Sequence, residues 1–424
     1  MKIVIAGGSG QVGTILARAF RKRGADVVIL SRSAAGGPGR GARWDGKTLG
    51  PWTAELDGAA ALVNLTGRSV NCRYSAANRR AIIDSRVDST RVLGEAIARC
   101  KVPPAVWLQA STATIYAHRY DVANDEASGI IGGNEPDVPE TWRFSIEVAK
   151  AWEQALDEAP ATATRRVKLR AAMIMSPDAG GVFDTLLGLV RRGLGGAAGD
   201  GEQYVSWIHH RDFVRSVEFL LERPELDGAI NVCSPGPVPN AEFMRALRDA
   251  WGARFGLPAS RWMLEVGAFF LRTETELVLK SRRVVPGRLL QAGFEFEFPS
   301  WPEAAAELCQ SVRTGTDEPD EPDDEVVTDV AALPIEDSID LHGFQPRDVP
   351  AVVASYLEAA AEKGFVEVRL IHGRGKGVQR ARVQALLSTH PLVESFRDAP
   401  ASRGGWGATV VELKAQRANP TLAS

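Results

Sequence analysis

The chain has 424 residues and a formal charge of −3, and this length predicts two or three domains of ~150 residues each. Its 45% hydrophobic and 24% charged residues are ordinary for a soluble globular protein. The four cysteines are scattered with no C-x-x-C pair, which excludes a disulfide scaffold and a zinc ribbon. No apolar run approaches the ~18 residues of a membrane span, and the run after Met1 is too short for a signal peptide. We therefore expect a cytoplasmic protein with no membrane partner.

Residues 1–312 alternate short β-branched runs with longer helical patterns. Strands are expected at Lys2–Ala6, Asp26–Leu30, Ala60–Leu65, Ala105–Ala110 and Val167–Met175, and helices at Gln11–Arg23, Ser75–Arg99 and Trp142–Leu156. Strands that alternate with helices predict an α/β fold with a doubly wound parallel sheet. After Asn231 the pattern turns mainly helical and is interrupted by prolines, so we read 240–312 as a small helical cap.

An acidic segment separates this region from the rest of the chain. It reads RTGTDEPDEPDDEVVTD from Arg313, with eight acidic residues and no aromatic one. Such a stretch repels itself and buries little apolar surface, which predicts an extended linker over 313–334. Residues 335–416 then form a separate α/β two-layer sandwich of order βαβαββ, with strands at Ser338–Leu341, Phe365–Ile371, Val393–Asp398 and Ala408–Leu413 and helices at Arg347–Lys363 and Val378–Thr389.

A glycine-rich loop follows the first expected strand and opens the first expected helix. It reads GGSGQVG over residues 7–13. Gly7 permits a tight turn, Gly10 lets the backbone approach a pyrophosphate, and Gly13 lets helix and strand pack closely. This placement predicts a Rossmann-like dinucleotide-binding domain over 1–239, against the alternative of a tight turn without a ligand. The predicted loop contacts are completed by Ser9, Gln11 and Val12.

The end of the second expected strand indicates which dinucleotide binds. An acid there would bind the ribose hydroxyls of NAD, whereas this strand ends in Ser31 and Arg32. Asp26 precedes the strand and is in the wrong place for that role. Because a guanidinium matches a 2′-phosphate, NADP is favoured over NAD. The alternative is that Arg32 is a solvated loop charge.

Together with this loop, four further segments resemble the extended short-chain dehydrogenase/reductase superfamily, and within it an atypical "epimerase family" of unknown substrate. They are VNLTG (63–67), DSRVDST (84–90), VSWIHHRDF (205–213) and KSRRVVPGRLLQAGFEFEFPSWPEAA (280–305), and the last resembles that family's short C-terminal domain. The resemblance implies that Leu65 and Thr66 pass near the adenine-ribose side of the cofactor. It also implies that Arg86 approaches the cofactor or the substrate, although Arg86 could merely cap a helix face.

The superfamily's proton shuttle is missing from this sequence. Its reductases use a Ser/Thr hydroxyl and a Tyr whose pKa a Lys four residues later lowers. The segment ASTATIYAH resembles the hydroxyl segment and places Thr112 at the catalytic position, but no tyrosine has a lysine four residues on. The nearest remnants at the missing positions are Ser145 with Ala149, or Ile146 with Lys150. Tyr116, Tyr120 and His118 are candidates for a substitute acid, and His209 and His210 are candidates for lining the substrate cleft. For all of them a structural role is favoured, which for the two histidines is capping of a helix start.

Two runs in the C-terminal unit place histidine and glycine at strand ends. The first, IDLHG, holds Asp340 and His342 on one face of a strand. The second, IHGRGKG, begins with His372 and continues into a glycine loop that exposes backbone N–H groups to phosphates. The loop residues expected to contact nucleic acid are Gly373, Arg374, Gly375 and Lys376.

These runs, with the ending GGWGATVVEL, resemble the small MutS-related (Smr) domain, a nuclease module. The resemblance implies DNA or RNA as partner and Asp340, His342 and His372 as catalytic positions. A metal-free mechanism is favoured over a divalent metal, because two candidate ligands are few. The alternative is a binding module that does not cut.

Three functional readings follow. The leading one is an NADP-binding reductase-like domain, with an unknown small-molecule substrate, tethered to a nuclease-like tail. In the second, the first domain senses cofactor without turnover and regulates the tail. In the third, it is a true oxidoreductase or epimerase and the tail is a binding module.

Overall fold

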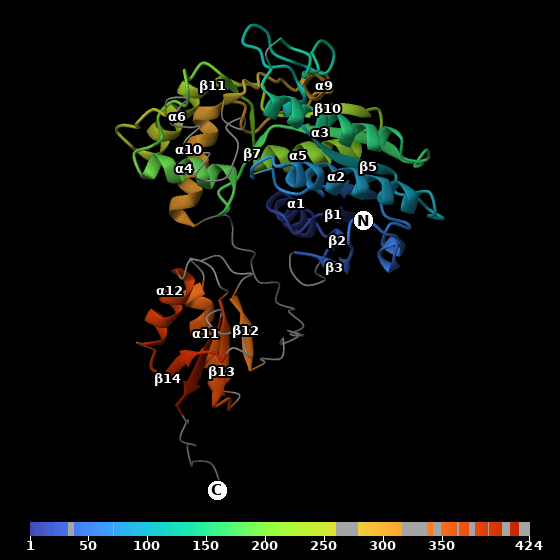
Figure 1. Ribbon diagram of the computed structural model, residues 1–424. Coiled ribbons are helices and arrows are strands. Elements are labelled where there is room, and N and C mark those ends of the chain that lie inside the picture. Colours follow the sequence, from blue (N-terminus) through green and yellow to red (C-terminus); the bar gives the residue numbers. More distant parts are fainter. Residues whose placement is uncertain are drawn as a thin grey trace. The chain divides into compact units, whose positions relative to one another are not determined.

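The chain divides into two units, Met1–Pro319 and Asp320–Ser424. In the computed structural model (Figure 1), the described residues are 1–32, 38–70, 72–136, 138–259, 279–315, 337–341, 349–362, 364–372, 378–388, 390–400 and 408–414. The predicted linker over 313–334 and the loop residues His342, Gly373, Arg374, Gly375 and Lys376 therefore lie largely or wholly outside the described residues.

The first unit is built on a seven-stranded parallel sheet of order β10-β6-β5-β4-β1-β2-β3. Its strands are β1 (Lys2–Ala6), β2 (Asp26–Ser31), β3 (Arg40–Arg43), β4 (Ala61–Asn64), β5 (Val106–Thr112), β6 (Arg165–Ala171) and β10 (Gly228–Val232). The order reverses between β1 and β4, and doubly wound sheets bind ligands at the carboxyl ends of the strands beside such a reversal. The predicted doubly wound parallel sheet is confirmed.

Helices cover both faces of this sheet. Ile3 and Ile5 of β1 share one hydrophobic cluster with α1 (Gln11–Lys22) and α5 (His210–Glu222). Val4 and Ala6 point the other way and share a second cluster with α2 (Ala76–Ile97) and Leu156 of α3 (Glu140–Asp157). Because strand side chains alternate, a continuous apolar run such as KIVIA supplies both cores at once. A short 3-10 turn, η1 (Pro51–Glu55), buries Trp52 in the second cluster.

The strand predicted over Val167–Met175 is two strands in two sheets. β6 ends at Ala171, and β7 (Met173–Met175) leaves the main sheet and pairs in parallel with β9 (Trp207–His209). Ala172 between them donates its N–H to the Val232 carbonyl. The apolar pattern continues through the break because both halves are buried, so the sequence carries no signal of the change of sheet.

The region 240–312 is mainly helical, as predicted, and packs with elements that precede it. It holds α6 (Asn240–Trp251), α9 (Gly287–Gln291) and α10 (Trp301–Thr314), and α10 continues two residues past 312. A third hydrophobic cluster joins α4 (Val182–Arg191), α6 and α10, with the rings of Phe243 and Trp301 stacked at 3.9 Å. A two-stranded sheet of β8 (Tyr204–Val205) and β11 (Val238–Pro239), too short to predict, lies beside α6.

The second unit is a four-stranded mixed sheet with two helices. Its elements are β12 (Ser338–Asp340), α11 (Val349–Glu362), β13 (Glu367–Ile371), α12 (Val378–Leu387), β14 (Val393–Asp398) and β15 (Ala408–Leu413). The sheet order is β12-β13-β15-β14, parallel between β12 and β13 and antiparallel elsewhere. Leu357 of α11, Val383 of α12 and Leu370 of β13 share one core. The predicted separate α/β sandwich is confirmed.

Candidate functional site

The glycine loop after β1 is shaped by close backbone approaches. Gly7 has φ 76°, and a Cβ there would lie 3.0 Å from the backbone of Leu65 and Thr66. A Cβ on Gly13 would lie 2.6 Å from the Gly8 carbonyl oxygen, so α1 packs directly on the loop. Gly10 differs, because the nearest atom to its would-be Cβ is the Gly7 carbonyl oxygen at 3.7 Å. The loop is therefore packed against backbone at Gly7 and Gly13, whereas Gly10 has room beside it.

The open side coincides with the N-terminus of α1. Gly10 is the N-cap with extended backbone, it has no side chain to cap the helix, and the first turn holds no acid. The first backbone N–H groups of a helix have no partner within it, so this turn presents donors and a positive dipole end. Ser9 is exposed, Gln11 Nε2 donates to the Asp178 carbonyl at 3.4 Å, and Val12 packs on the core. These residues fit a bound pyrophosphate.

Polar groups at the end of β4 face the same loop. Asn64 Oδ1 accepts the Thr66 N–H at 3.0 Å, which fixes the turn through Leu65. Thr66 Oγ1 is buried and has no hydrogen-bond partner among the described residues. A buried hydroxyl without a partner costs free energy unless a ligand or water completes it, which also fits a cofactor at this edge.

The carboxyl end of β2 carries one cation, Arg32, and no acid. Ser31 is buried and Arg32 is exposed beyond it, whereas Asp26 begins the strand at the opposite end. In the sheet register Ser31 pairs with Arg43, the exposed last residue of β3. The sequence reasoning missed Arg43, because β3 is short and polar and only the register brings it beside Ser31.

A pocket of about 210 Å³ opens at the carboxyl end of β5. Thr112 lies in its wall, and its Oγ1 accepts the Thr114 N–H at the start of the 3-10 turn η2 (Ala113–Ile115). Ser145 of α3 also lines it, with its Oγ 3.3 Å from the Tyr74 hydroxyl. Lys150 is not in the wall, and its Nζ donates to the Gly132 carbonyl. The remaining wall is largely apolar and includes Val70, Phe144, Val148, Trp152 and Met173.

Arg86 projects from α2 into the wall of this pocket. Its Nη1 donates to the carbonyls of Arg68 and Ile82, each at 3.0 Å, and its guanidinium carbon lies 4.8 Å from the Trp152 ring centroid. Burial lowers the pKa of Arg86 to about 10, and the Tyr74 phenol acts in the opposite direction. No described carboxylate pairs with it, so the positive charge is held among carbonyl dipoles and an aromatic face.

Tyr116, one of the candidate substitute acids, belongs to a buried network whose members are not among the residues that line the pocket. Its hydroxyl donates to Asn231 Oδ1 at 2.9 Å and accepts from Arg170 Nη1 at 3.0 Å. Arg170 pairs in a bidentate manner with Glu153, which accepts the Ser111 hydroxyl at 2.7 Å. Burial raises the pKa of Tyr116. The network connects β5, β6, α3 and β10. Both hydrogen bonds of the Tyr116 hydroxyl are made within it, which gives this hydroxyl a structural role.

The other two candidate substitute acids, Tyr120 and His118, are not among the residues that line the pocket. Tyr120 is 41% exposed, and His118 Nδ1 accepts the Ser281 N–H at 2.8 Å.

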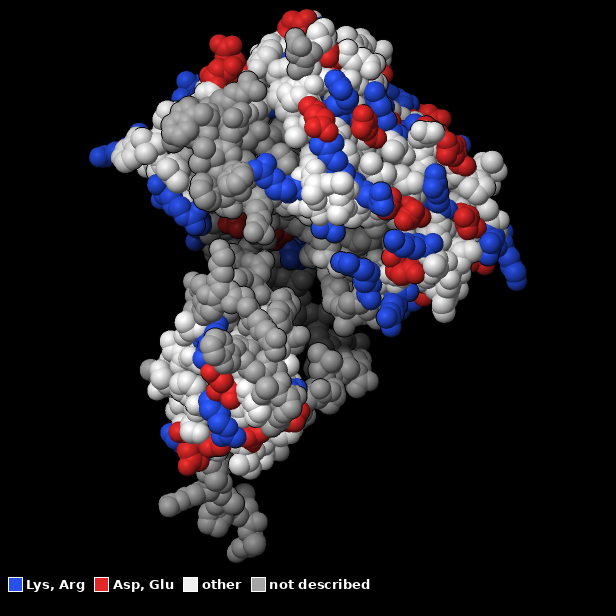
Figure 2. Space-filling model, in the orientation of Figure 1, with Lys and Arg blue, Asp and Glu red and all other residues white. Residues whose placement is uncertain are grey.

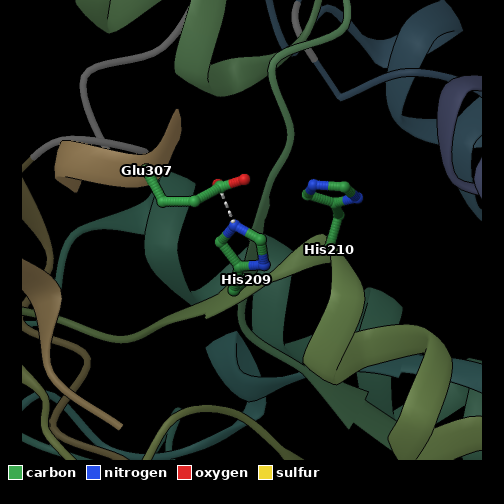
Figure 3. Close-up of side chains that lie close together, drawn as sticks. All are labelled: His209, His210 and Glu307. Carbon is green, nitrogen blue, oxygen red and sulfur yellow. Dashed lines mark hydrogen bonds and ion pairs between the residues drawn. The ribbon is translucent and has the colours of Figure 1, made fainter. Parts of the chain in front are cut away.

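His209, His210 and Glu307 offer ligand atoms within 4.8 Å of one another, a spacing that a metal ion could use (Figure 3). The Arg211 backbone N–H donates to His209 Nδ1, so His209 Nε2 carries the proton and donates to Glu307 Oε2 at 2.8 Å. A metal bound by His209 Nε2 would need the lone pair of that nitrogen, so the ring proton would have to move to Nδ1. There the proton would face the Arg211 N–H, which needs an acceptor. These hydrogen bonds fit His209 as the N-cap of α5, which is the structural role favoured from the sequence, better than a metal ligand.

In the second unit, three strand ends meet at one sheet edge. Asp340 ends β12 opposite Ile371 of β13, and Ile371 pairs with Ala408 at the start of β15. His372 follows directly, is 3% exposed, and its Nε2 lies 2.9 Å from the Thr409 hydroxyl. The topology therefore places Asp340 and His372 on neighbouring strand ends, while the His342 and Gly373–Lys376 parts of the expected site lie outside the described residues.

Family models match three parts of the chain. Residues 3–233, more than half of it, match the NAD dependent epimerase/dehydratase family. The chain belongs to this family. Residues 259–308 match a domain of unknown function, DUF1731, and residues 339–414 match the Smr domain. The resemblances to the epimerase family and to the Smr domain are thereby confirmed.

Individual members of the epimerase family resemble the first unit over nearly their full length. The epimerase family protein SDR39U1 of Bos taurus is 32% identical over 73% of this chain and 99% of its own length. The epimerase family protein Mb2239 of Mycobacterium bovis is 32% identical over 69% and 93%. A crystal structure of human SDR39U1 with NADPH aligns at a TM-score of 0.64 and 28% identity, covering 73% of this chain and 99% of that one.

No helix among the described residues is long and apolar enough to cross a bilayer. On the face of the first unit that Figure 2 shows, Lys and Arg are interspersed with Asp and Glu.

Proposed function

We propose that the first unit binds NADP(H) in preference to NAD(H). The observation that carries this is the open glycine loop at α1 combined with Arg32, and no acid, at the end of β2. The unpartnered Thr66 hydroxyl, Arg43 beside Ser31, and the NADPH bound to a 28% identical relative support it. Bound NADPH supplies a hydride donor. Calorimetric titration of the full chain with NADPH and NADH tests the proposal, and equal affinities contradict it.

We further propose that turnover in this unit is slow. Thr112 offers a hydroxyl at the pocket, but Ser145 and Lys150 do not supply the Tyr and Lys of the usual shuttle. General acid–base groups contribute roughly 10²–10⁴-fold to rates. Rapid NADPH consumption with common aldehydes or sugar nucleotides contradicts this proposal.

For the second unit we propose binding and cleavage of nucleic acid. Support comes from the Smr match and from the register that puts Asp340 and His372 on adjacent strand ends. His342 acts as base with Asp340 orienting it, His372 acts as acid or phosphate contact, and the Gly373, Arg374, Gly375 and Lys376 loop holds the phosphate. A metal-free mechanism is preferred to one with a divalent cation.

The test is nicking of single-stranded RNA, duplex DNA and branched DNA by the full chain at low salt. His342→Ala should abolish cutting and keep binding, while Lys376→Ala should weaken binding and flatten its salt dependence. Activity that survives EDTA supports the metal-free version. Failure to shift or nick any of these nucleic acids contradicts the proposal.

Two alternatives differ in what NADPH does. If the first unit is a sensor, cutting changes when NADPH is added and no metabolite is turned over. If it is a true oxidoreductase or epimerase, a metabolite panel consumes cofactor and the tail only binds.

The proposed boundaries are 1–239 for the NADP-binding domain, 240–312 for the helical domain, 313–334 for the linker and 335–416 for the Smr domain. We expect the cytoplasm as location, with which four free cysteines agree.

A further inference from the structure

The pocket at Thr112 combines positive charge with an apolar wall. Two guanidiniums line it, Arg86 from α2 and Arg282, while none of its described lining residues is acidic. Arg282 is buried, and its Nε donates to Thr114 Oγ1 at 3.0 Å, which fixes it to the turn that follows Thr112. Two cations on one small wall create a field that favours an anion.

Arg86 lines the pocket and retains hydrogen-bonding capacity. Its Nη1 serves two carbonyls, and among the described residues its Nε and Nη2 have no partner. A half-buried guanidinium without a carboxylate is costly, and its planar fork suits two oxygens of a carboxylate or phosphate. The lowered pKa of Arg86 agrees with a site that gains free energy when an anion enters.

The dimensions and the rest of the wall limit what the anion carries. The volume of about 210 Å³ is below the ~300–1,000 Å³ usual for pockets of drug-sized ligands. Phe144, Val148 and Trp152 offer flat and apolar surface beside the cations. A ligand with an apolar body of about one ring and a single anionic group satisfies both parts of the wall.

We propose that this pocket is the substrate site of the first unit, and that it takes a compact anion whose carboxylate or phosphate is held by Arg86 with Arg282 beside it. The proposal rests on the proposed NADP(H) binding, since it assigns the pocket to a substrate that the cofactor would serve. It separates Arg86 from the cofactor contacts at the glycine loop and at Arg32.

The test measures small probes against the full chain saturated with NADPH. Benzoate and phenyl phosphate are titrated by calorimetry, and benzamide is the neutral counterpart of benzoate. We expect at least one of the two anions to bind at least tenfold more tightly than benzamide. Arg86→Gln should weaken that anion about 10- to 100-fold and leave benzamide and NADPH affinity within twofold. Arg91→Gln, the same change at an exposed position of α2, should leave the affinities for the anion, benzamide and NADPH unchanged.

Several results overturn the proposal. Two of them come from the unmodified protein. The first is that benzamide and both anions bind equally well, and the second is that neither anion binds although NADPH does. If Arg86→Gln lowers NADPH affinity but not anion affinity, Arg86 belongs to the cofactor. If Arg86→Gln does not fold, Arg282→Gln replaces it and should weaken the anion, and unchanged anion affinity in that variant also overturns the proposal. Absence of NADPH binding is a separate result that contradicts the proposed function, and the anion titrations are then repeated without cofactor.

Discussion

Arg32 occupies the position at the end of β2 that distinguishes the two nicotinamide cofactors, and its side chain is exposed. We predict that Arg32→Ala weakens NADPH about 10- to 100-fold, because a charged hydrogen bond contributes ~1.5–3 kcal/mol, and leaves NADH nearly unchanged. Calorimetric titration of both cofactors measures the effect. Arg21→Ala, at an exposed position in the last turn of α1, is the matched control and should change neither affinity. Parallel losses for both cofactors would remove Arg32 from 2′-phosphate recognition.

His210 is a neutral imidazole in an environment that opposes its protonation. Burial, followed by the neighbouring His209, lowers the pKa of His210 to about 3, although Glu307 and Asp178 act in the opposite direction and Arg211 adds to the lowering. Its Nε2 is buried without a described partner. The unfolded chain therefore binds a proton at this residue below pH ~6.5 when the folded chain does not.

This imbalance predicts how stability depends on pH. Between about pH 6.5 and pH 3 the free energy of unfolding should fall as pH falls, with His210 contributing at most about 1.4 kcal/mol per pH unit. In His210→Phe that contribution disappears, so the loss of stability from pH 7 to pH 5 should be smaller. Urea unfolding at several pH values measures the slope, and identical slopes in both proteins would contradict the assignment.

At the scale of elements, the glycines of the β1–loop–α1 segment have two different roles, close packing at Gly13 and approach of the ligand at Gly10. A Cβ on Gly13 would collide with the Gly8 backbone, whereas a Cβ on Gly10 would make only an ordinary contact, with the Gly7 carbonyl oxygen at 3.7 Å. We predict that Gly13→Ala lowers the thermal unfolding midpoint by several degrees because backbone must shift. Gly10→Ala should leave the midpoint within about 2 °C, since Ala at an N-cap costs ~1 kcal/mol or less relative to Gly, yet it should lose NADPH affinity at least tenfold.

Thermal unfolding and cofactor titration of the two variants form one experiment with opposite expected outcomes. Unchanged NADPH affinity in a folded Gly10→Ala protein would mean that the pyrophosphate does not approach this loop.

The same elements show which features could be predicted from sequence. The glycine loop is local, because seven consecutive residues encode strand end, turn and helix start, and it could be predicted with its ligand class. Arg43 could not be predicted, since only the register of β3 brings it to Ser31. Arg86 and Arg282 meet in one pocket although they lie far apart in the chain, and no periodicity encodes that meeting. The change of sheet between β6 and β7 was also missed, because burial on both sides produces one apolar run.

At the scale of the whole molecule, each unit has its own core. The described clusters around β1, α2 and α10 contain residues of the first unit, and the cluster around α11 and β13 contains residues of the second. The glycine loop, Arg32 and the Thr112 pocket all lie in the first unit. We predict that a fragment of residues 1–315 binds NADPH with an affinity within twofold of the full chain. Calorimetry of both proteins checks this, and a loss of tenfold or more would show that the second unit contributes to the cofactor site.

The pocket at Thr112 lies where the chain leaves one sheet for another. Ala171, the last residue of β6, packs against the core of the main sheet, and Met173, the first of β7, packs against the core of α4, α6 and α10, yet both line the pocket. A ligand seated there would contact the two cores at once. Its binding free energy would then be lost when either core opens, so the ligand would oppose partial unfolding of each and make the thermal transition of the first unit more cooperative.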